Sequence, residues 1–258
     1  MAALYSIENY ERPSVAADAV VFGIDSVSSD NRKSLKQKKL KLLLVKRGEE
    51  PFAGSYSLPG GFLRKGETVE TAAERELAEE AGVSRPKLIE LKVYSRPDRD
   101  PRGWIISCCF IALTNTVELM TEKNSDALSA HWADLETFSD DEGLSFRLSL
   151  DGKVLYEYAD GGITVNELAF DHGEMIKDAF IKLRDEVINH DMIFDLMPEY
   201  FAISDLQQPY ETITGIKLSP QGFRKKIIGK LEETELFEEA AAHRTSRLYR
   251  RAKGRCGI

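Results

Sequence analysis

The N-terminal half of the chain alternates short apolar runs with polar segments. Residues 16–24 and 40–46 are dense in aliphatic side chains and predict two buried strands, joined through a Ser- and Lys-rich loop. Residues 87–94 and 104–114 predict two further strands on either side of a polar loop. A helix begins near residue 68, between the two pairs of strands. Because strands lie on both sides of a central helix, the pattern predicts a mixed α/β sandwich.

Residues 139–166 carry a hairpin signal. Residues 146–150 and 153–158 alternate apolar and polar side chains on either side of Asp151-Gly152, a dipeptide that favours tight β-turns. We interpret this segment as an insertion in the first domain, either a surface arm or a structure that touches a ligand pocket. Of the two, we favour the surface arm.

Residues 171–189 predict a long amphipathic helix. Asp171 lies three residues before Glu174, which is the spacing of a capping box at a helix start. Apolar residues then recur every three or four positions, which places them on one helix face: Ile176, Phe180, Leu183 and Val187. We interpret this helix as the link into a second domain, so the expected domains are residues 1–166 and 167–258.

Two short helices and a hairpin follow in the C-terminal part. Gly215 ends the first helix. Ser219 and Pro220 start the second, since Ser caps helix N-termini and Pro favours the first helical turn. Apolar pairs at 236–237 and 248–249 then flank a polar tip. A helix, a turn, a basic helix and a two-stranded wing predict a winged helix-turn-helix.

Charge is divided unevenly along the chain. The formal net charge is −8, but residues 215–258 hold eleven basic and five acidic residues, a net charge of +6 that leaves −14 on the remainder. This asymmetry favours a phosphate-bearing partner for the C-terminal part. The basic second helix would enter the major groove of double-stranded DNA, and the wing would contact the DNA backbone. The side chains that we expect to bind DNA are Gln221, Arg224, Lys225, Arg244 and Arg247.

Composition argues against a membrane or secreted protein. Apolar residues make up 42% of the chain and charged residues 30%, and no apolar run approaches the ~20 residues that a membrane helix needs. The N-terminus lacks a signal-peptide pattern. Cys108, Cys109 and Cys256 are odd in number and lack metal-ligand spacing, which favours reduced thiols. We therefore expect a cytoplasmic protein with no membrane partner.

One segment carries a specific chemical signal. Gly61 is followed after five residues by Glu67 and, after seven more, by residues 75–83, which begin with Arg75. Residues three and four apart share a helix face, so three carboxylates would project together: Glu76, Glu79 and Glu80. These carboxylates repel one another unless a hard cation lies among them, and all-oxygen sites suit Mg²⁺ or Mn²⁺. Gly60 and Gly61 would let the backbone approach the metal or a phosphate closely. The planar guanidinium of Arg75 would hold one carboxylate in place.

The segment from Leu58 to Val83 resembles a complete Nudix box, the signature of hydrolases that act on nucleoside diphosphates linked to another moiety. The resemblance implies the Nudix α/β/α sandwich over residues 14–138, with Mg²⁺ or Mn²⁺ as cofactor. The metal would activate a water for attack on the pyrophosphate, and the base would be Glu76 or a carboxylate outside the cassette. The implied metal ligands are the Gly60 carbonyl, Glu76, Glu79 and Glu80. The same fold can also serve a ligand-sensing domain.

The order of Nudix domain, linker helix and winged helix resembles the NrtR-type Nudix-related transcriptional regulators. Residues 95–103 resemble the Asp-Pro-Arg loop of that family, and residues 168–172 resemble the beginning of its linker helix. The resemblance implies a homodimer on a palindromic operator, whose hold on DNA weakens when ADP-ribose or a related metabolite binds. The expected ligand-binding residues are Arg47, Gly61, Arg99 and Arg102.

Three functions stay open at this point. The first, which we favour, is an ADP-ribose-type sensing transcriptional regulator with an intact Nudix box and residual Mg²⁺-dependent hydrolysis. The second is a dedicated ADP-ribose pyrophosphatase whose C-terminal domain dimerises or regulates. The third is a sugar-responsive transcriptional regulator. In all three we interpret His172 as a helix-cap residue and His243 as a wing-tip residue, not as catalytic groups.

Overall fold

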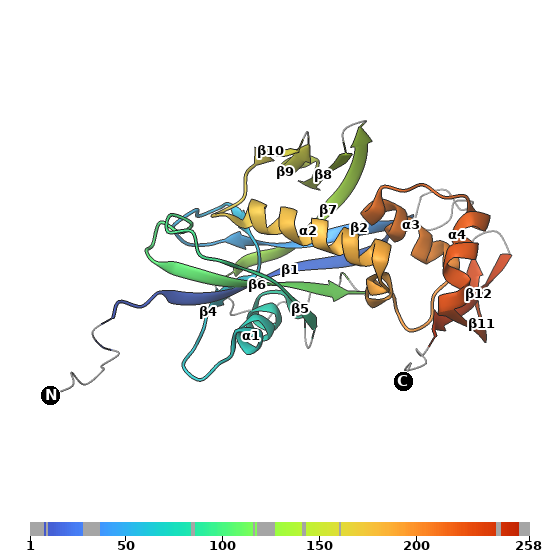
Figure 1. The fold of residues 1–258 in the computed structure, drawn as a ribbon, viewed down its shortest axis with the longest axis horizontal. Helices are drawn as coiled ribbons and strands as arrows, with labels where there is room; N and C mark the ends of the chain where they lie inside the picture. The colour runs from blue at the N-terminus through green and yellow to red at the C-terminus, as the bar shows by residue number, and fades with distance from the viewer. Residues whose placement is uncertain are drawn as a thin grey trace.

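A mixed sheet with long central strands organises the first part of the chain (Figure 1). The computed structural model describes residues 8, 10–27, 37–83, 86–115, 117, 127–140, 143–159, 161–240 and 244–252. Within these residues the strand order is β10-β9-β8-β7-β2-β1-β6-β5, with β3 beside β2 and β4 beside β1. Strands β1 and β6 pair in parallel, and the other pairs of this sheet are antiparallel. The strands are β1 (Ser14–Val27), β2 (Gln37–Arg47), β3 (Tyr56–Ser57), β4 (Gly60–Phe62), β5 (Lys87–Tyr94), β6 (Ile105–Thr114), β7 (Ala127–Asp140), β8 (Gly143–Leu150), β9 (Lys153–Ala159) and β10 (Gly162–Asn166).

Helices cover both faces of this sheet. Because side chains alternate along a strand, β1 supplies two cores. Val20 and Phe22 pack toward α2 (His172–Asn189), whereas Ala19 and Val21 pack toward Leu77 of α1 (Val69–Ala81). Figure 1 shows the two helices on opposite sides of the sheet. The predicted α/β/α sandwich is therefore confirmed.

The predicted hairpin forms around Asp151-Gly152, but it is not a surface arm. Its strands β8 and β9 extend the main sheet, and its apolar side chains enter the core. Phe146 is fully buried, and its ring centroid lies 4.4 Å from that of Phe180 on α2. The apolar face of the hairpin is buried because the apolar stripe of α2 lies against it. None of the described hairpin residues lines the cavity at the Nudix box.

Helix α2 has the predicted apolar stripe and a different start. Ile176, Phe180, Leu183 and Val187 are all buried. The expected capping box is absent, because Asp171 makes no side-chain hydrogen bond to the helix backbone. Its carboxylate instead accepts hydrogen bonds from Arg99 Nε at 3.0 Å and Nη2 at 2.8 Å. A buried guanidinium is a stronger partner than a backbone amide.

The C-terminal part has the predicted winged helix-turn-helix. Gly215, at φ +73°, ends α3, and the Ser219 hydroxyl accepts a hydrogen bond from Gly222 N at 3.1 Å to start α4. Phe223 and Ile227 bury one side of α4. The elements are the 3₁₀ turn η2 (Met192–Leu196), α3 (Ile203–Thr214), α4 (Pro220–Ile227), the 3₁₀ turn η3 (Ile228–Lys230), β11 (Leu231–Ala240) and β12 (Arg244–Arg251). Strands β11 and β12 form the antiparallel wing.

Hydrogen bonds hold the winged helix against the main sheet and α2. The Thr137 hydroxyl donates to the Thr212 carbonyl at 2.6 Å, and Arg184 Nε donates to the Thr214 carbonyl at 3.2 Å. Arg184 belongs to α2, so the helix that covers the sheet also contacts the end of α3. One buried core runs through both parts, including Phe180, Leu206 and Phe223.

Cys108 and Cys109 carry free thiols in β6, and Cys256 lies outside the described residues. Within the described part of the chain, no helix combines the length and apolar character that a membrane crossing requires.

Gly23 on β1 provides a test of the packing beneath α1. A Cβ at this position would lie 2.9 Å from Trp132 Cη2 and 3.2 Å from Thr114 Cγ2. We expect Gly23→Ala to lower the free energy of unfolding by about 1–3 kcal/mol, the usual effect of overpacking. Denaturant unfolding measures this. Gly162→Ala is the control, because nothing lies near its Cβ, and it should change stability by less than about 0.5 kcal/mol. Equal losses of unfolding free energy in Gly23→Ala and Gly162→Ala would show that close packing at Gly23 is not the cause.

Candidate functional site

Two glycines bring the Nudix-box loop into direct contact with its neighbours. Gly60 pairs with Asp18 on β1, and a Cβ at Gly60 would overlap the Asp18 carboxylate and lie 2.6 Å from the Ala17 carbonyl oxygen. A Cβ at Gly61 would overlap the carboxylate of Glu76. Any larger side chain at either position would push the loop away from the carboxylates. The glycines therefore fix the distance between β4, β1 and α1.

The loop after β4 ends in a capped helix. The Thr68 hydroxyl accepts from Thr71 N at 3.2 Å, and the Thr71 hydroxyl accepts from Thr68 N at 2.8 Å. This reciprocal cap starts α1, and Gly82, at φ +67°, ends it in the left-handed conformation. Local sequence alone therefore defines both ends of the acidic helix.

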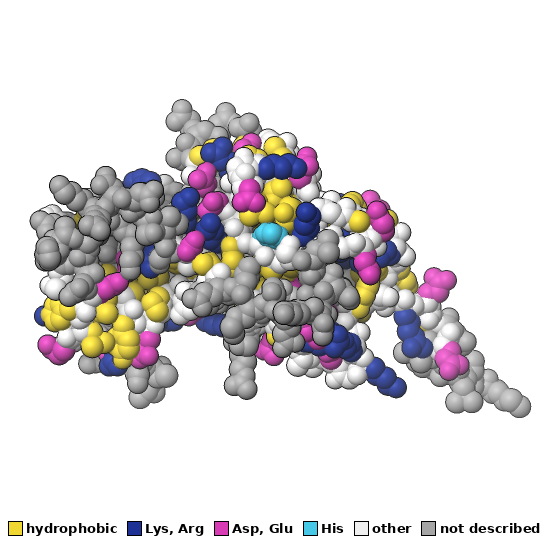
Figure 2. All heavy atoms as spheres, turned by 180° about the vertical axis from the view of Figure 1, so that it is seen from behind, with side chains coloured by type: hydrophobic (Ala, Val, Ile, Leu, Met, Phe, Trp, Pro, Cys, Tyr) yellow, Lys and Arg dark blue, Asp and Glu magenta, His cyan; other side chains and the backbone are white. Residues whose placement is uncertain are grey.

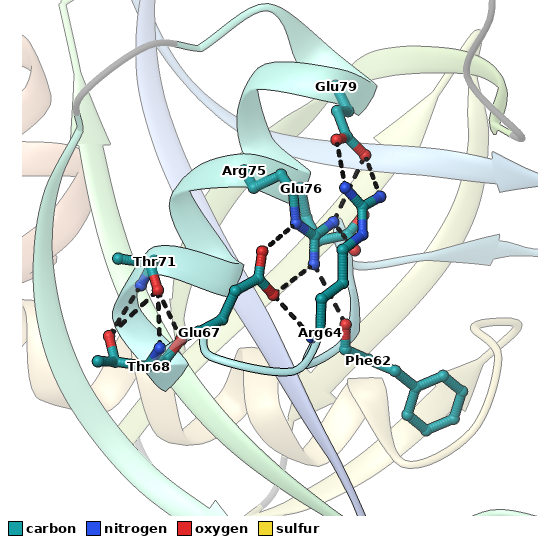
Figure 3. A network of polar contacts seen from close by, with 8 residues as sticks. All are labelled: Phe62, Arg64, Glu67, Thr68, Thr71, Arg75, Glu76 and Glu79. Atoms are coloured by element: carbon teal, nitrogen blue, oxygen red, sulfur yellow. Dashed lines mark hydrogen bonds and ion pairs between the residues drawn. The ribbon is translucent and has the colours of Figure 1, made fainter.

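Arg75 joins the loop to the helix (Figure 3). Its Nε and Nη2 donate to the two oxygens of Glu67 at 2.7 and 3.0 Å, and its Nη1 donates to Glu76 Oε1 at 2.5 Å. The Arg75 hydrogen bonds lower the pKa of Glu67 to about 2. The same guanidinium reaches the Phe62 carbonyl at 3.2 Å. Arg75 thus fixes the shape of the loop as well as tethering a carboxylate.

Glu76, Glu79 and Glu80 line one cavity of about 690 Å³, together with Gly60 and Gly61. Each carboxylate accepts hydrogen bonds. Arg75 donates to Glu76 and, at 3.4 Å, to Glu79, which also accepts from Arg64 at 3.2 Å. The Gly60 backbone N–H donates to Glu80 at 3.0 Å. As positioned, no three acidic, His or Cys side chains among the described residues converge closely enough to hold a metal ion. Mg²⁺ commonly keeps several waters and binds through one or two carboxylates, so Glu76, Glu79 and Glu80 are the side chains that would hold it.

Burial disfavours the ionised form of two carboxyl groups in this cavity, Glu80 and Asp18. Burial, with Glu76 and Asp18 nearby, raises the pKa of Glu80 to about 8, although the Gly60 N–H opposes the shift. Burial likewise raises the pKa of Asp18 to about 6, and its carboxylate accepts a hydrogen bond from the Ser107 hydroxyl. A divalent cation would favour the ionised form of each group. This all-carboxylate donor set fits Mg²⁺ or Mn²⁺.

Asp18 is a site residue that the sequence analysis missed. It lies inside β1 between Ala17 and Ala19, and its side chain is 7% exposed. A single acidic residue within an apolar strand was the available signal, because an unpaired buried carboxylate is costly and needs a nearby function or partner. Its proximity to Gly60 depends on strand pairing, which local sequence does not specify.

A second set of residues that line the cavity is basic and aromatic. The Arg47 guanidinium lies 4.7 Å from the centroid of the Phe170 ring, and Arg102 lies 5.0 Å from the Phe62 and Phe170 centroids. Phe170 adopts φ +54°, an uncommon conformation for a bulky residue. These side chains offer positive charge for phosphates and flat surfaces for a planar group.

The four expected ligand-binding residues all line this cavity: Arg47, Gly61, Arg99 and Arg102. Their environments differ. Arg99 is 5% exposed and its guanidinium is engaged by Asp171, so it anchors residues 95–103 to the start of α2. Arg102 is more open and pairs with Asp100 at 2.7 Å.

His172 also belongs to the cavity wall. It is the first residue of α2, and its Nδ1 accepts a hydrogen bond from the Leu58 backbone N–H at 2.8 Å. Burial lowers the pKa of His172 to about 3, so the ring is neutral at neutral pH and Nδ1 can accept. The sequence indicated a residue at a helix start, but not this contact with Leu58, which lies between β3 and β4.

The expected DNA-binding residues lie on α4 and the wing. Gln221, Arg224 and Lys225 are exposed on α4, opposite its buried side, and Arg247 is exposed on β12. Arg224 Nη2 donates to the Tyr249 hydroxyl at 3.0 Å. Arg244 is the first residue of β12, but its side chain and all of His243 lie outside the described residues.

Many basic residues of this region are paired with acidic ones. Arg247 contacts Glu233 at 2.6 Å, and Arg250 contacts Glu232 at 2.7 Å. Arg251 lies 3.4 Å from Asp195. On the face shown in Figure 2, basic and acidic side chains are interspersed. Glu232 and Glu233 are already included in the net charge of residues 215–258, but Asp191 and Asp195 lie outside this range and pair with Lys230 and Arg251.

Comparisons with known proteins match both parts of the chain. Residues 34–150 match the NUDIX domain, and residues 193–251 match the NrtR DNA-binding winged helix domain.

Similar proteins divide between regulators and hydrolases. The chain is 29% identical over 252 residues to the ADPR responsive transcriptional repressor NtrR of Acinetobacter baylyi, covering 96% of this chain and 86% of that protein. It is 36% identical over 169 residues to the ADP-ribose pyrophosphatase of Methanocaldococcus jannaschii, covering 66% and 74%. The crystal structure of Shewanella oneidensis NrtR superposes with a TM-score of 0.62 at 25% identity, covering 92% of this chain and 94% of that one. The chain therefore belongs to the Nudix family and carries the DNA-binding winged helix of the NrtR-type regulators.

Proposed function

We propose that this chain is an ADP-ribose-responsive transcriptional regulator. It binds double-stranded DNA through α4 and the wing, and ADP-ribose in the Nudix cavity weakens that binding. One observation carries the proposal: a single helix, α2, contacts both functional regions. Its first residue, His172, lines the cavity, and its Arg184 donates to the last residue of α3. The Acinetobacter baylyi relative, an ADPR responsive transcriptional repressor, supports the same function.

The acidic residues of the cavity suit the cation of a metal-bound nucleoside diphosphate sugar, and its basic residues suit the phosphates. Glu76, Glu79 and Glu80 would hold Mg²⁺ or Mn²⁺. Arg47 and Arg102 would bind the phosphates through charge-assisted hydrogen bonds. The rings of Phe62 and Phe170 offer the adjacent flat surfaces for a base or a ribose.

The DNA complex would follow the usual geometry of a winged helix. Helix α4 would lie in the major groove, while the wing and its Arg247 would contact the phosphate backbone. A homodimer would place two such helices on a palindromic operator. Ligand and DNA are then coupled through the arrangement of the two domains, and each lowers the affinity of the other by the same factor.

Hydrolysis is a second function that the site favours, because the Nudix box is complete and the Methanocaldococcus jannaschii relative is an ADP-ribose pyrophosphatase. The bound cation would withdraw charge from the pyrophosphate and activate a water. The protein's own contribution is to position the phosphates with Arg47 and Arg102 and to accept the water proton. Glu76 and the newly identified Asp18 are the candidate bases.

The DNA interface is tested by the double variant Arg224→Ala, Lys225→Ala. We expect its affinity for a duplex from the chain's own upstream region to fall about tenfold or more. The slope of log K against log salt should flatten by about two, since two phosphate contacts are lost. Fluorescence anisotropy across a salt series measures both quantities. Arg147→Ala with Lys153→Ala, on the β8–β9 hairpin, is the charge-matched control. Unchanged DNA affinity in the α4 variant would refute the assignment of α4.

Ligand coupling is tested with ADP-ribose and Mg²⁺ in the same anisotropy assay. We expect the Kd for DNA to rise about five- to 150-fold at saturating ligand, the usual range of allosteric coupling. Arg102→Ala should weaken ADP-ribose binding and leave DNA binding without ligand unchanged. Arg96→Ala is the control from the same loop, where Arg96 pairs only with Asp98 among the described residues. If ribose but not ADP-ribose raised the Kd for DNA, the chain would instead be a sugar-responsive regulator.

The metal site is tested by Glu80→Gln, which removes a carboxylate and keeps its shape. We expect weaker Mn²⁺ binding by calorimetry and at least about a hundredfold slower release of AMP from ADP-ribose, because a metal ligand that stabilises the transition state is lost. Glu70→Gln is the control on the first turn of α1, away from the cavity lining. AMP release at the wild-type rate would disprove the metal role of Glu80.

A further inference from the structure

Glu233 lies between two of the arginines that we expect to bind DNA, Arg224 and Arg247. Arg247 Nη1, on the wing, donates to Glu233 Oε2 at 2.6 Å. Arg224 Nη2, on α4, lies 3.9 Å from Glu233 Oε1 and also donates to the Tyr249 hydroxyl at 3.0 Å. One carboxylate thus faces the basic residue of the recognition helix and the basic residue of the wing.

Stability does not account for this arrangement. The side chains of Glu233, Arg224 and Arg247 are 53%, 51% and 40% exposed. Ion pairs at such exposure contribute ~0–1 kcal/mol to folding. Their charges matter more for an incoming polyanion, since Glu233 neutralises the arginines that would attract phosphates.

Pairing of an arginine with Glu233 competes with binding of that arginine to a DNA phosphate. Binding of any DNA sequence depends on the number of phosphates that basic residues neutralise, with release of counterions. An arginine bound to Glu233 must leave that carboxylate before it can contact a phosphate. Glu233 also repels phosphates that approach the junction of α4 and the wing.

We propose that Glu233 weakens sequence-independent binding to duplex DNA by pairing with Arg247 and by facing Arg224. This inference rests on the proposed DNA-binding function. Non-specific complexes depend almost entirely on phosphate contacts, so they lose most from the pairing. A specific complex adds contacts to base edges, which offset the loss.

The test uses Glu233→Gln, which removes the charge and preserves the size of the side chain. The probe is a fluorescein-labelled duplex of random sequence, titrated with the full chain in a salt series. We expect Glu233→Gln to bind about three- to tenfold more tightly at low salt, with a salt slope steeper by about one to two, because one or two more phosphates are neutralised.

Glu235→Gln is the matched control. Glu235 is exposed on the same strand, and no ion pair joins it to another described residue. Glu235→Gln removes the same charge as Glu233→Gln, so a general electrostatic effect would change both affinities alike. We expect a smaller gain for Glu235→Gln, because it frees no arginine for phosphate binding. In the background Arg224→Ala, Arg247→Ala, the gain from Glu233→Gln should disappear. Thermal melting of each variant confirms that the winged helix is folded.

The results distinguish the role of Glu233 from the DNA-binding function itself. Wild-type affinity in Glu233→Gln, equal gains in both glutamate variants, or a gain that persists without the two arginines would each overturn the role of Glu233. Failure of the wild-type chain and every variant to bind the duplex at low salt would overturn the DNA-binding function itself.

Discussion

Burial of one face of α2 between the central sheet and the β8–β9 hairpin is the contact on which both functional regions depend. Phe180 lies at its centre, with ring centroids 6.3 Å from Phe22 and 4.4 Å from Phe146. Aromatic side chains buried in this way dominate core energetics. With its middle fixed, an 18-residue helix places its two ends ~27 Å apart in defined positions. One end forms part of the cavity wall, and the other reaches α3.

The cavity is lined by groups of both charges. Carboxylates come from α1 and β1, and arginines come from β2 and from residues 95–103. The two sets interact, since Arg47 opposes the upward shift of the Glu80 pKa. A ligand that carries both a cation and phosphates complements both sets. The same arrangement suits sensing and hydrolysis, which explains why family members can share the site and differ in function.

Local signals predicted those elements whose residues interact over short distances in sequence. The caps of α1, the glycine that ends α3 and the Ser-Pro start of α4 all involve partners within a few residues. Asp171 was misassigned because its partner, Arg99, lies 72 residues away. The hairpin was misassigned for the same reason, since only tertiary packing shows that α2 covers its apolar face. Asp18 and the Leu58–His172 contact likewise depend on pairing between distant segments. The charge count of the C-terminal part left out Asp191 and Asp195, which precede residues 215–258 in sequence but pair with Lys230 and Arg251.

The junction between the two domains has a further consequence for sequence variation. Thr137 and Arg184 donate to backbone carbonyls of α3, not to its side chains. Substitution of a solvent-facing residue of α3 leaves those acceptors in place, because every residue type carries the same carbonyl group. These contacts therefore restrict the two donors and leave the exposed positions of the winged helix free to diversify. A regulator built in this way can acquire a new target sequence while its attachment to the sensing domain is retained.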